Sequence, residues 1–429
     1  MVIGVVDERG GQVFAGGKLD NGTSDNVDGD SVFFIGSVSK TFTALLLQKM
    51  ADRGEVKLDD PVAKYLPKSV TMPTRSGKEV TLLHLATHAG GFPHDADNMS
   101  GKDTQEQFET YTVEKMYEYL SGFKLTRDPG TEFEYSNLGM ALLGHVLARK
   151  AGTNFEALVI NRICRPLNMS NTRVVPTPEM KSRLAMGHDA TGKLFPPYQL
   201  VVYAPAGAVH STANDLLKYA AAQAGLTGSS LTTSMEKTHV IRYKDTHGRG
   251  GEANFHGNTA MAWMQRGDPS PPGMDLRGHA GGAGSYHAWV GFDKKQRRGV
   301  VVLSTAEIYS VEQVGQLVLR HEPLRRENLV ENTYEPVGIG ASLELDQTTH
   351  LLRITRIISN TPAFYAGLSA GLMIQRIDDI ATTSKTLAEN VNLLRGKAGT
   401  KVRLELINSD QNTTNTVELT RQKFVLVRQ

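Results

Sequence analysis

The segment Ser37-Val38-Ser39-Lys40 is the most informative in the chain, because it places a hydroxyl and an amine three positions apart. Apolar residues at helical spacing follow as far as Asp52, and Gly54 ends the pattern, so a helix is predicted here. Positions i and i+3 share one face of a helix, which brings Lys40 close to Ser37. An amine at that distance can activate a serine hydroxyl for covalent catalysis. Alone, the pattern also fits an N-cap serine beside a solvated lysine.

A second motif, Tyr135-Ser136-Asn137, follows the turn signal Asp128-Pro129-Gly130 and precedes a predicted helix over Leu138–Lys150. A tyrosine near Ser37 could accept the serine proton and return it to a leaving group. The amide of Asn137 could donate to Lys40 or to a substrate carbonyl. The alternative is that Tyr135 is a packed aromatic residue and Asn137 the N-cap of the helix.

A third motif, His279-Ala280-Gly281-Gly282-Ala283-Gly284, comes before an apolar stretch over His287–Gly291. Glycines allow a substrate to lie against the backbone, as an edge strand that supplies an oxyanion-hole N–H must do. The alternative is a flexible glycine-rich turn.

In this order, Ser-x-x-Lys, Tyr-x-Asn and a Lys/His-x-Gly motif resemble the serine β-lactamase and penicillin-binding-protein superfamily. The tyrosine of the second motif resembles the class C β-lactamase branch, with its related esterases, D-aminopeptidases and DD-carboxypeptidases. The resemblance covers residues 1–323 and includes further segments, namely Leu82–Gly91 ("LLxHxSG"), Pro129–Asn137 ("PGxxFxYSN"), Pro166–Met169 and Pro205–Gly207.

The resemblance implies an α/β (α+β) fold of the β-lactamase/transpeptidase type, with an antiparallel sheet flanked by helices. It also implies that Ser37 is acylated and that Lys40 and Tyr135 share proton transfer. Asn137 would bind the acyl side of the substrate, and His279 would hold the cationic position of the third motif. Gly281 and Gly282 would lie against the substrate, with the backbone N–H groups of Ser37 and Gly282 forming the oxyanion hole. Such chemistry needs no cofactor, and we expect none.

The third motif departs from the Lys-Thr-Gly of class C β-lactamases. Ala280 cannot donate a hydrogen bond, and His279 is mostly neutral near pH 7. Losing a charge-assisted contact of this kind costs about 1.5–3 kcal/mol of carboxylate recognition. We therefore expect a carboxylesterase that acts on small acyl esters. The alternatives are a D-Ala-D-Ala carboxypeptidase, a D-aminopeptidase or a class C-type β-lactamase.

The composition agrees with a globular enzyme. The 429 residues suffice for two domains, and the net charge of +2 favours neither nucleic acid nor an anionic membrane as a partner. The single cysteine, Cys164, is expected to be a packed thiol. His84 and His88 are four residues apart but lack the glutamate of a zinc motif, so we expect structural or capping roles and no metal.

The beginning of the chain bears on localisation. No membrane span or signal-peptide pattern is visible, so the chain as given is expected to be cytoplasmic, or periplasmic or secreted if a leader is missing. The family has a helix before the strand that Met1–Glu8 resembles. Either the chain is truncated or another segment covers that side of the sheet.

The C-terminal part has a different pattern. We expect a serine hydrolase domain over 1–323, a charged linker over 324–334 and a PDZ-like β-sandwich/α domain over 335–429. Gly338-Ile339-Gly340-Ala341 resembles a carboxylate-binding loop, and Leu387–Leu394 resembles the helix lining a peptide groove. Such a domain would bind a peptide C-terminus by strand addition. The alternatives are a structural appendage with an unused groove, or a peptide-binding protein whose hydrolase is vestigial.

Overall fold

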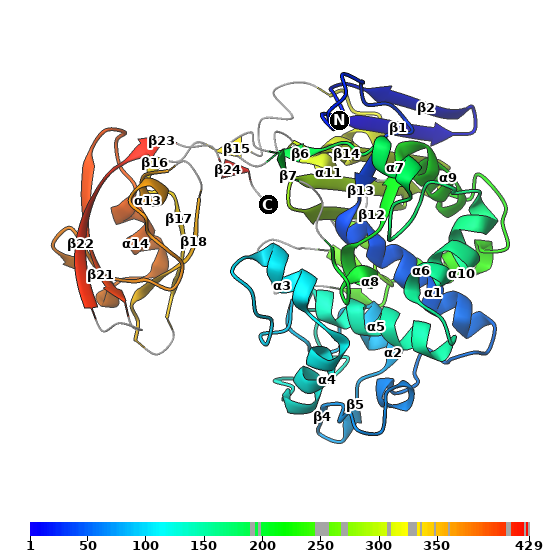
Figure 1. The fold of residues 1–429 in the computed structure, drawn as a ribbon, viewed down its shortest axis with the longest axis horizontal. Coiled ribbons are helices and arrows are strands. Elements are labelled where there is room, and N and C mark those ends of the chain that lie inside the picture. The colour runs from blue at the N-terminus through cyan, green and yellow to red at the C-terminus, as the bar shows by residue number, and fades with distance from the viewer. Residues whose placement is uncertain are drawn as a thin grey trace. The chain divides into compact units, whose positions relative to one another are not determined.

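The computed structural model describes residues 1–188, 194–195, 199–244, 257–266, 273–306, 310–324, 333–334, 337–346, 349–358, 361–408, 413–423 and 426–427. Its backbone contacts divide the chain into two compact units (Figure 1). The first unit comprises Met1–Gly187, Leu194–Glu307 and Val311–Leu324, and the second comprises His188–Lys193, Ile308–Ser310 and Arg325–Gln429. Of the predicted linker, residues 325–332 lie outside the described part.

The first unit is built on a sheet of eight antiparallel strands in the order β2-β1-β14-β13-β12-β11-β10-β9. The order shows that the two ends of this unit's sequence meet, because β1 pairs with β14. The strands are β1 Val2–Asp7, β2 Gly10–Ala15, β14 Arg298–Ser304, β13 Tyr286–Asp293, β12 Leu276–Ala283, β11 Met264–Arg266, β10 Gly257–Thr259 and β9 Tyr243–Lys244. The predicted antiparallel sheet flanked by helices is confirmed.

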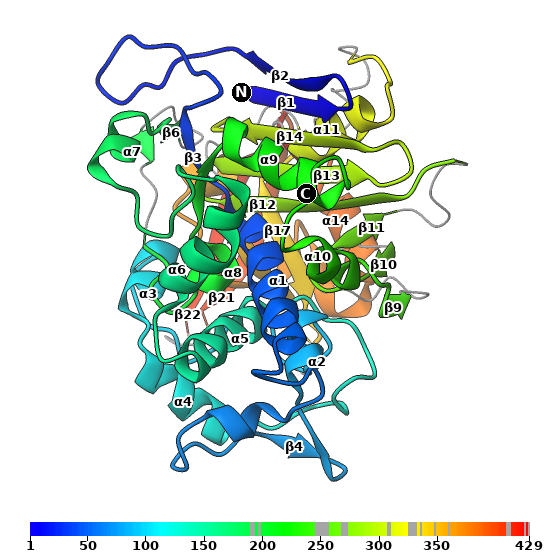
Figure 2. The same ribbon diagram turned by 90° about the vertical axis from the view of Figure 1, so that its right-hand side faces the viewer.

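Helices cover both faces of this sheet (Figure 2). Helix α9 (Ala213–Gln223) packs on β1 and β14, where a Cβ at Gly4 would touch Leu217. Helix α11 (Val311–Leu319) packs on β13 and β14 from the opposite face. Alternate residues of a strand point to opposite faces, and Trp289 points toward α11.

Trp289 of β13 is enclosed by glycines. A Cβ added at Gly278 of β12 would lie 2.7 Å from its indole, and one added at Gly291 or at Gly315 of α11 would lie 2.0 Å from it. Each of these positions therefore needs glycine while the indole stays where it is. The three glycines allow a large buried side chain to fit between the sheet and α11.

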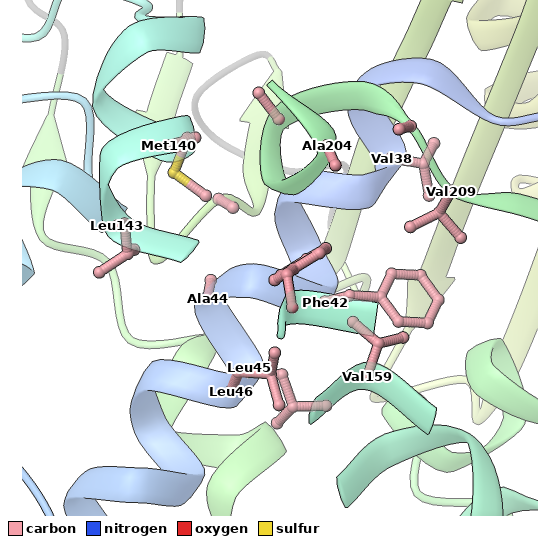
Figure 3. Packing of buried hydrophobic residues seen from close by; sticks show 14 of the residues in the cluster. Val38, Phe42, Ala44, Leu45, Leu46, Met140, Leu143, Val159, Ala204 and Val209 are labelled. Carbon is pink, nitrogen blue, oxygen red and sulfur yellow. The ribbon is translucent and has the colours of Figure 1, made fainter. Parts of the chain in front are cut away.

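Helix α1 (Ser39–Asp52) is buried along most of its length, since every residue from Ser39 to Gln48 is buried. Phe42, Leu45 and Leu46 lie in a cluster with Met140 and Leu143 of α5 (Asn137–Lys150), as Figure 3 shows. A helix that is buried around its whole circumference is held by the core rather than by its own propensity. The core thus fixes the position of the first turn of α1.

The structure agrees with the helix signals around α1 and corrects the one at the start of α5. Helix α1 begins at Ser39, directly after the turn that carries Ser37, and Gly54 follows its end with φ of +72°. Helix α5 is capped by Ser136, whose Oγ accepts from the N–H of Gly139 at 2.9 Å, so an N-cap at Asn137 is wrong by one residue. Cys164 is buried, and burial raises the pKa of its thiol to about 12.

The first unit also contains smaller elements. They are η1 Gly36–Val38, α2 Leu82–Ala86, α3 Thr104–Thr110, α4 Val113–Gly122, α6 Phe155–Val159, α7 Pro178–Ser182, α8 Ala204–Gly207, α10 Thr232–Thr238, and the strand pairs β3 Val32–Phe34 with β8 His210–Thr212, β4 Thr74–Arg75 with β5 Lys78–Glu79, and β6 Gly187–His188 with β7 Leu194–Phe195. None of the helices in the described residues is both long and apolar enough to cross a membrane.

The second unit has its own sheet and core. The sheet order is β17-β18-β19-β21-β22, with β20 beside β19, and Ile354, Ile374 and Leu404 are buried at its centre. Helix α14 (Leu387–Leu394) has the predicted bounds and packs near β17 and β19. The other elements are β17 Ala341–Leu345, β18 Leu352–Ile357, β19 Met373–Ile377, β20 Ile380–Ala381, β21 Lys401–Asn408, β22 Thr413–Thr420, α13 Pro362–Tyr365, and the pairs β15 Thr333–Tyr334 with β24 Leu426–Val427 and β16 Val337–Gly338 with β23 Gln422–Lys423.

Candidate active site

The serine of the first motif lies on a tight turn between β3 and α1. Gly36 opens this turn with φ of +50°, and a Cβ there would lie 2.8 Å from the backbone nitrogen of Gly282. Ser37 is partly exposed, whereas Val38 and Lys40, which follow it, are fully buried. The turn therefore presents one hydroxyl to the surface at the start of a buried helix.

Lys40 lies directly behind this hydroxyl. Its Nζ donates to Ser37 Oγ at 2.8 Å and to the carbonyl oxygen of Ala206 at 2.7 Å. Ala206 belongs to α8, the segment that contains Pro205-Ala206-Gly207. The same Nζ lies 4.8 Å from the centroid of the Tyr135 ring. The structure thus brings together the three residues that the sequence assigns to catalysis.

Tyr135 is buried among imidazole rings. Its ring centroid lies 4.5 Å from that of His88, 5.8 Å from that of His94 and 6.3 Å from that of His279. The second motif therefore meets the third motif through a ring contact.

His88 is the described histidine ring closest to Tyr135, and the sequence had indicated for it only a place in a family segment and a structural or capping role. Its Nδ1 accepts from the backbone N–H of Ser136 at 3.1 Å, so the proton of the neutral ring is on Nε2. Burial holds the pKa of His88 well below its ordinary value, and the charge of Lys40 lowers it further. His88 is therefore a neutral ring beneath Tyr135.

His84 serves a different purpose. Its Nδ1 accepts from the backbone N–H of Thr81, while the hydroxyl of Thr81 accepts from the N–H of His84, both at 3.2 Å. This reciprocal pair caps α2, in agreement with the predicted capping role. Within the described ranges, no cluster of three or more His, Cys, Asp or Glu side chains is placed to hold a metal ion.

Asn137 is engaged by two residues that sequence reasoning missed. Its Nδ2 donates to Oδ1 of Asp95 at 3.2 Å, and its backbone N–H donates to the carbonyl oxygen of His94 at 2.8 Å. His94 and Asp95 follow the Leu82–Gly91 segment closely, and that proximity to a recognised motif was the signal available in the sequence.

The third motif lies in β12, against the turn that carries Ser37. A Cβ at Gly281 would lie 2.1 Å from the carbonyl oxygen of Ile35 and 3.0 Å from the backbone nitrogen of Ser37. Gly282 follows, with open space where its Cβ would be. The strand thus passes so close to the turn that Gly281 cannot carry a side chain without separating the two, whereas Gly282 can.

Strand β12 is an edge strand for only part of its length. In the sheet order it lies between β13 and β11, but the recorded pairing with β11 is limited to Met264 and Gly278. From His279 to Ala283 the described strands pair with it through β13 alone. Among the described strands, the expectation of an edge strand therefore holds for the part of the motif that lies in β12, His279 to Ala283.

His279 does not reproduce a lysine. Its side chain is only 3% exposed, and its Nδ1 lies 2.5 Å from the carbonyl oxygen of Ala280, to which it donates. This nitrogen is thus committed to the protein backbone. An imidazole held in this way lacks the projecting ammonium of a Lys-Thr-Gly motif.

Comparison with known proteins places these features in context. The sequence model of the family described as Beta-lactamase matches residues 1–320. The chain is 35% identical over 190 residues to the D-alanyl-D-alanine-carboxypeptidase/endopeptidase AmpH of Escherichia coli, covering 44% of this chain and 48% of that protein. It is 28% identical over 345 residues to a Beta-lactamase of Pseudomonas fluorescens, covering 73% and 90%. The alignment with the Escherichia coli protein therefore spans about half of that relative's length.

Solved structures give the same result for the fold. A Beta-lactamase/D-alanine Carboxypeptidase from Yersinia pestis, complexed with citrate, superposes with a TM-score of 0.63 at 25% identity, covering 74% of this chain and 92% of that one. The D-alanine Carboxypeptidase AmpC from Burkholderia cenocepacia superposes with a TM-score of 0.61 at 26% identity, covering 75% and 93%.

Proposed function

Because the chain belongs to the Beta-lactamase family, whose members are serine hydrolases, we propose that it cleaves acyl donors through an acyl-enzyme on Ser37. The observation that carries the proposal is the 2.8 Å contact between Lys40 Nζ and Ser37 Oγ, with the Tyr135 ring 4.8 Å from the same amine. A serine with a basic group at this distance can lose its proton as it attacks a carbonyl carbon.

The steps follow from the positions of these groups. Lys40 and Tyr135 take the proton from Ser37 Oγ, which bonds to the substrate carbonyl carbon. The backbone N–H groups of Ser37 and Gly282 stabilise the negative oxygen that forms. The bond between the carbonyl carbon and the leaving group then breaks, and Tyr135 gives the proton to the departing group. Water next loses a proton to the same groups as it attacks the acyl-enzyme, and the bond to Ser37 Oγ breaks as this oxygen regains a proton.

We further propose that the preferred substrates are small acyl esters without a carboxylate beside the scissile bond. The support is the third motif, in which Ala280 lacks a hydroxyl and His279 donates to the backbone. A second candidate is cleavage of D-alanyl peptides or β-lactams, which is favoured by the names of the relatives. The two candidates differ in whether the site must hold a carboxylate.

Mass spectrometry after incubation with a fluorophosphonate tests the nucleophile. One adduct is expected on the peptide that contains Ser37, and Ser37→Ala should abolish both the adduct and turnover. Ser182→Ala, which changes an exposed serine, is the matched control. An adduct elsewhere, or full activity of Ser37→Ala, would refute the assignment. Absence of any adduct would favour a vestigial hydrolase.

A substrate panel tests the preference. Rates with p-nitrophenyl acetate and butyrate should exceed those with nitrocefin and D-Ala-D-Ala peptides. The double change His279→Lys with Ala280→Thr should raise nitrocefin turnover relative to ester turnover, because it restores an ammonium and a hydroxyl. Faster hydrolysis of nitrocefin than of the esters by the unmodified enzyme would contradict the ester preference.

For the second unit we propose a PDZ-like module that binds a peptide C-terminus. The support is that β17 is the first strand of its sheet, with α14 packed near it. Gly340, directly before β17, has φ of +81°. A loop whose successive backbone N–H groups point at one carboxylate uses such a backbone conformation. Peptides with free C-termini should bind in a fluorescence anisotropy assay and their amidated forms should not. Equal binding of both forms would refute carboxylate recognition.

A further inference from the structure

The short helix α8 supplies the carbonyl group that holds Lys40. The backbone hydrogen bonds of this single turn end on the carbonyl oxygens of Tyr203 and Ala204. The last carbonyl groups of a helix have no partner within that helix. In α8 the carbonyl oxygens of Pro205 and Ala206 accept from side chains of α1 instead. The position of Ala206, and with it that of Lys40 Nζ, therefore depends on contacts outside α8.

Thr43 of α1 holds the neighbouring carbonyl group. Its Oγ1 donates to the carbonyl oxygen of Pro205 at 2.7 Å, while the carbonyl oxygen of Ser39 lies farther away, at 3.4 Å. Lys40 and Thr43 are three positions apart and share one face of the helix, so they bind adjacent carbonyl groups of α8. Thr43 is fully buried, and a buried carbonyl group without a donor is unfavourable. The hydroxyl therefore fixes α8 against α1.

Helix α5 contacts α8 as well, through a glycine. A Cβ added at Gly144 would lie 2.2 Å from both Cβ and Cγ of Pro205. Because Gly144 has no side chain, the ring of Pro205 can lie directly against the backbone of α5. Pro205 is thus packed on α5 through its ring and bonded to α1 through its carbonyl group. Only the second of these two contacts is a hydrogen bond that one substitution can remove.

We infer that Thr43 is a positioning residue for Lys40 and acts on it through α8. The inference rests on the proposed function, because it requires Lys40 to take the proton of Ser37. The carbonyl oxygen of Ala206 holds Lys40 Nζ at 2.7 Å, in a place where Nζ also lies 2.8 Å from Ser37 Oγ. Without the Thr43 hydroxyl, α8 moves away from α1 and Nζ follows its acceptor. Since catalysis depends steeply on geometry, this displacement slows acylation without weakening substrate binding.

Two buried threonines of α1 provide a matched test. Thr43→Val removes the hydroxyl that binds α8 and keeps the branched shape of the side chain. Thr41→Val is the control, because Thr41 is equally buried but donates to the carbonyl oxygen of Val38 and accepts from the hydroxyl of Tyr219. Its loss disturbs the core without touching α8. Stopped-flow measurements with p-nitrophenyl butyrate give the acylation rate constant at saturation and, separately, the dissociation constant of the ester.

Thr43→Val should lower the acylation rate constant by about tenfold to a hundredfold and leave the dissociation constant unchanged. Thr41→Val should acylate nearly as fast as the unmodified enzyme, and so should Thr43→Ser, which keeps the hydroxyl. A merely structural role would lower the melting temperatures of both valine variants without separating their rate constants. The inference is overturned if Thr43→Val acylates as fast as Thr41→Val, or if Thr43→Ser is as slow as Thr43→Val.

The unmodified enzyme separates this inference from the proposed function. If Ser37 is acylated and the two valine variants react alike, only the positioning role of Thr43 is wrong. If Ser37 is not acylated, the proposed function and the positioning role are both wrong. Should the melting curve show that Thr43→Val does not fold, Thr43→Ala and Thr41→Ala replace the valine pair. The same difference in acylation rate constant is then expected, and equal rate constants overturn the inference.

Discussion

The imidazole of His88 is stacked on the phenol ring of Tyr135, with ring centroids 4.5 Å apart and ring planes 26° from parallel. His88 has φ of +56°, an uncommon backbone conformation for a residue other than glycine. The hydrogen bond from Ser136 to its Nδ1 ties this ring to the residue that follows Tyr135. The contact therefore holds the phenol at a defined position relative to Lys40.

We expect His88→Ala to lower kcat by up to about a hundredfold with little change in KM, because the phenol loses its support. His88→Phe keeps a stacking ring but leaves the N–H of Ser136 without its acceptor, which costs about 1–3 kcal/mol of stability. The phenylalanine variant should thus be more active than the alanine variant. Steady-state kinetics and urea unfolding check both. Equal kcat values for the two variants would show that stacking is unimportant.

Tyr135→Phe and Lys40→Ala should each slow acylation by about 10²–10⁴-fold. Both changes remove a proton-transfer group. Because the two residues act as a unit, removing the second after the first has little further effect, so the double variant should be little slower than either single variant. Stopped-flow acylation with a chromogenic ester measures the step directly. Near-normal acylation in Tyr135→Phe would leave Lys40 as the base and make Tyr135 a packing residue.

The contact between β12 and the serine turn gives a matched pair of glycine substitutions. Gly281→Ala places a methyl group where the carbonyl oxygen of Ile35 lies 2.1 Å away, so it should separate the strand from Ser37. Gly282→Ala meets no atom within 4 Å and should not change the melting temperature. We expect Gly281→Ala to lower both the melting temperature and fluorophosphonate labelling. Wild-type labelling in Gly281→Ala would contradict the close approach of β12.

Stability should fall as the pH drops below the ordinary histidine pKa. Burial lowers the pKa of His210 to about 4, so between about pH 6.5 and 4 the unfolded chain binds a proton that the folded chain does not. Stability is thus full above this window and declines through it, by about 1.4 kcal/mol per pH unit for one histidine. His210→Gln keeps a donor for Val174 but cannot titrate. In urea unfolding at several pH values, the free energy of unfolding of His210→Gln should decline less steeply with falling pH than that of the unmodified protein. Identical declines would refute this role of His210.

A chain that ends after Leu324 should retain hydrolysis of p-nitrophenyl esters, because all the residues assigned to catalysis lie in the first unit. The measurement is the kcat/KM of this shorter chain, compared with that of the full chain. Soluble but inactive protein would refute the division of roles between the units. Insoluble protein would mean that the first unit depends on the rest of the chain for folding.

The sequence was sufficient to predict the elements whose local pattern is strong. The i, i+3 spacing predicted the contact between Ser37 and Lys40, and the apolar periodicity predicted the helix that follows them. Each of these signals is local, or is part of a motif with a fixed order. The predicted bounds of α14 are likewise set by a local capping box at Thr386.

The remaining site contacts depend on residues far apart in the chain. Nothing in the sequence near Tyr135 indicates that its ring meets His88 and His279, which are brought there by different elements. The carbonyl oxygen of Ala206 binds Lys40 as a backbone atom, so its residue type carries no signal. The pairing of Asn137 with Asp95 depends equally on how the loop before α3 folds.

Because of its glycines, β12 packs closely against its neighbours on both faces of the sheet. On one face Gly278 contacts the indole of Trp289, and on the other Gly281 contacts the turn that carries Ser37. A larger side chain at Gly315 of α11 would displace the indole, and the displaced indole would push the strand toward the serine. Helix α11 contributes none of the residues assigned to catalysis, yet its Gly315 lies against the indole that packs on β12. Close packing at the back of the sheet is thus transmitted through one strand to the serine turn at its front.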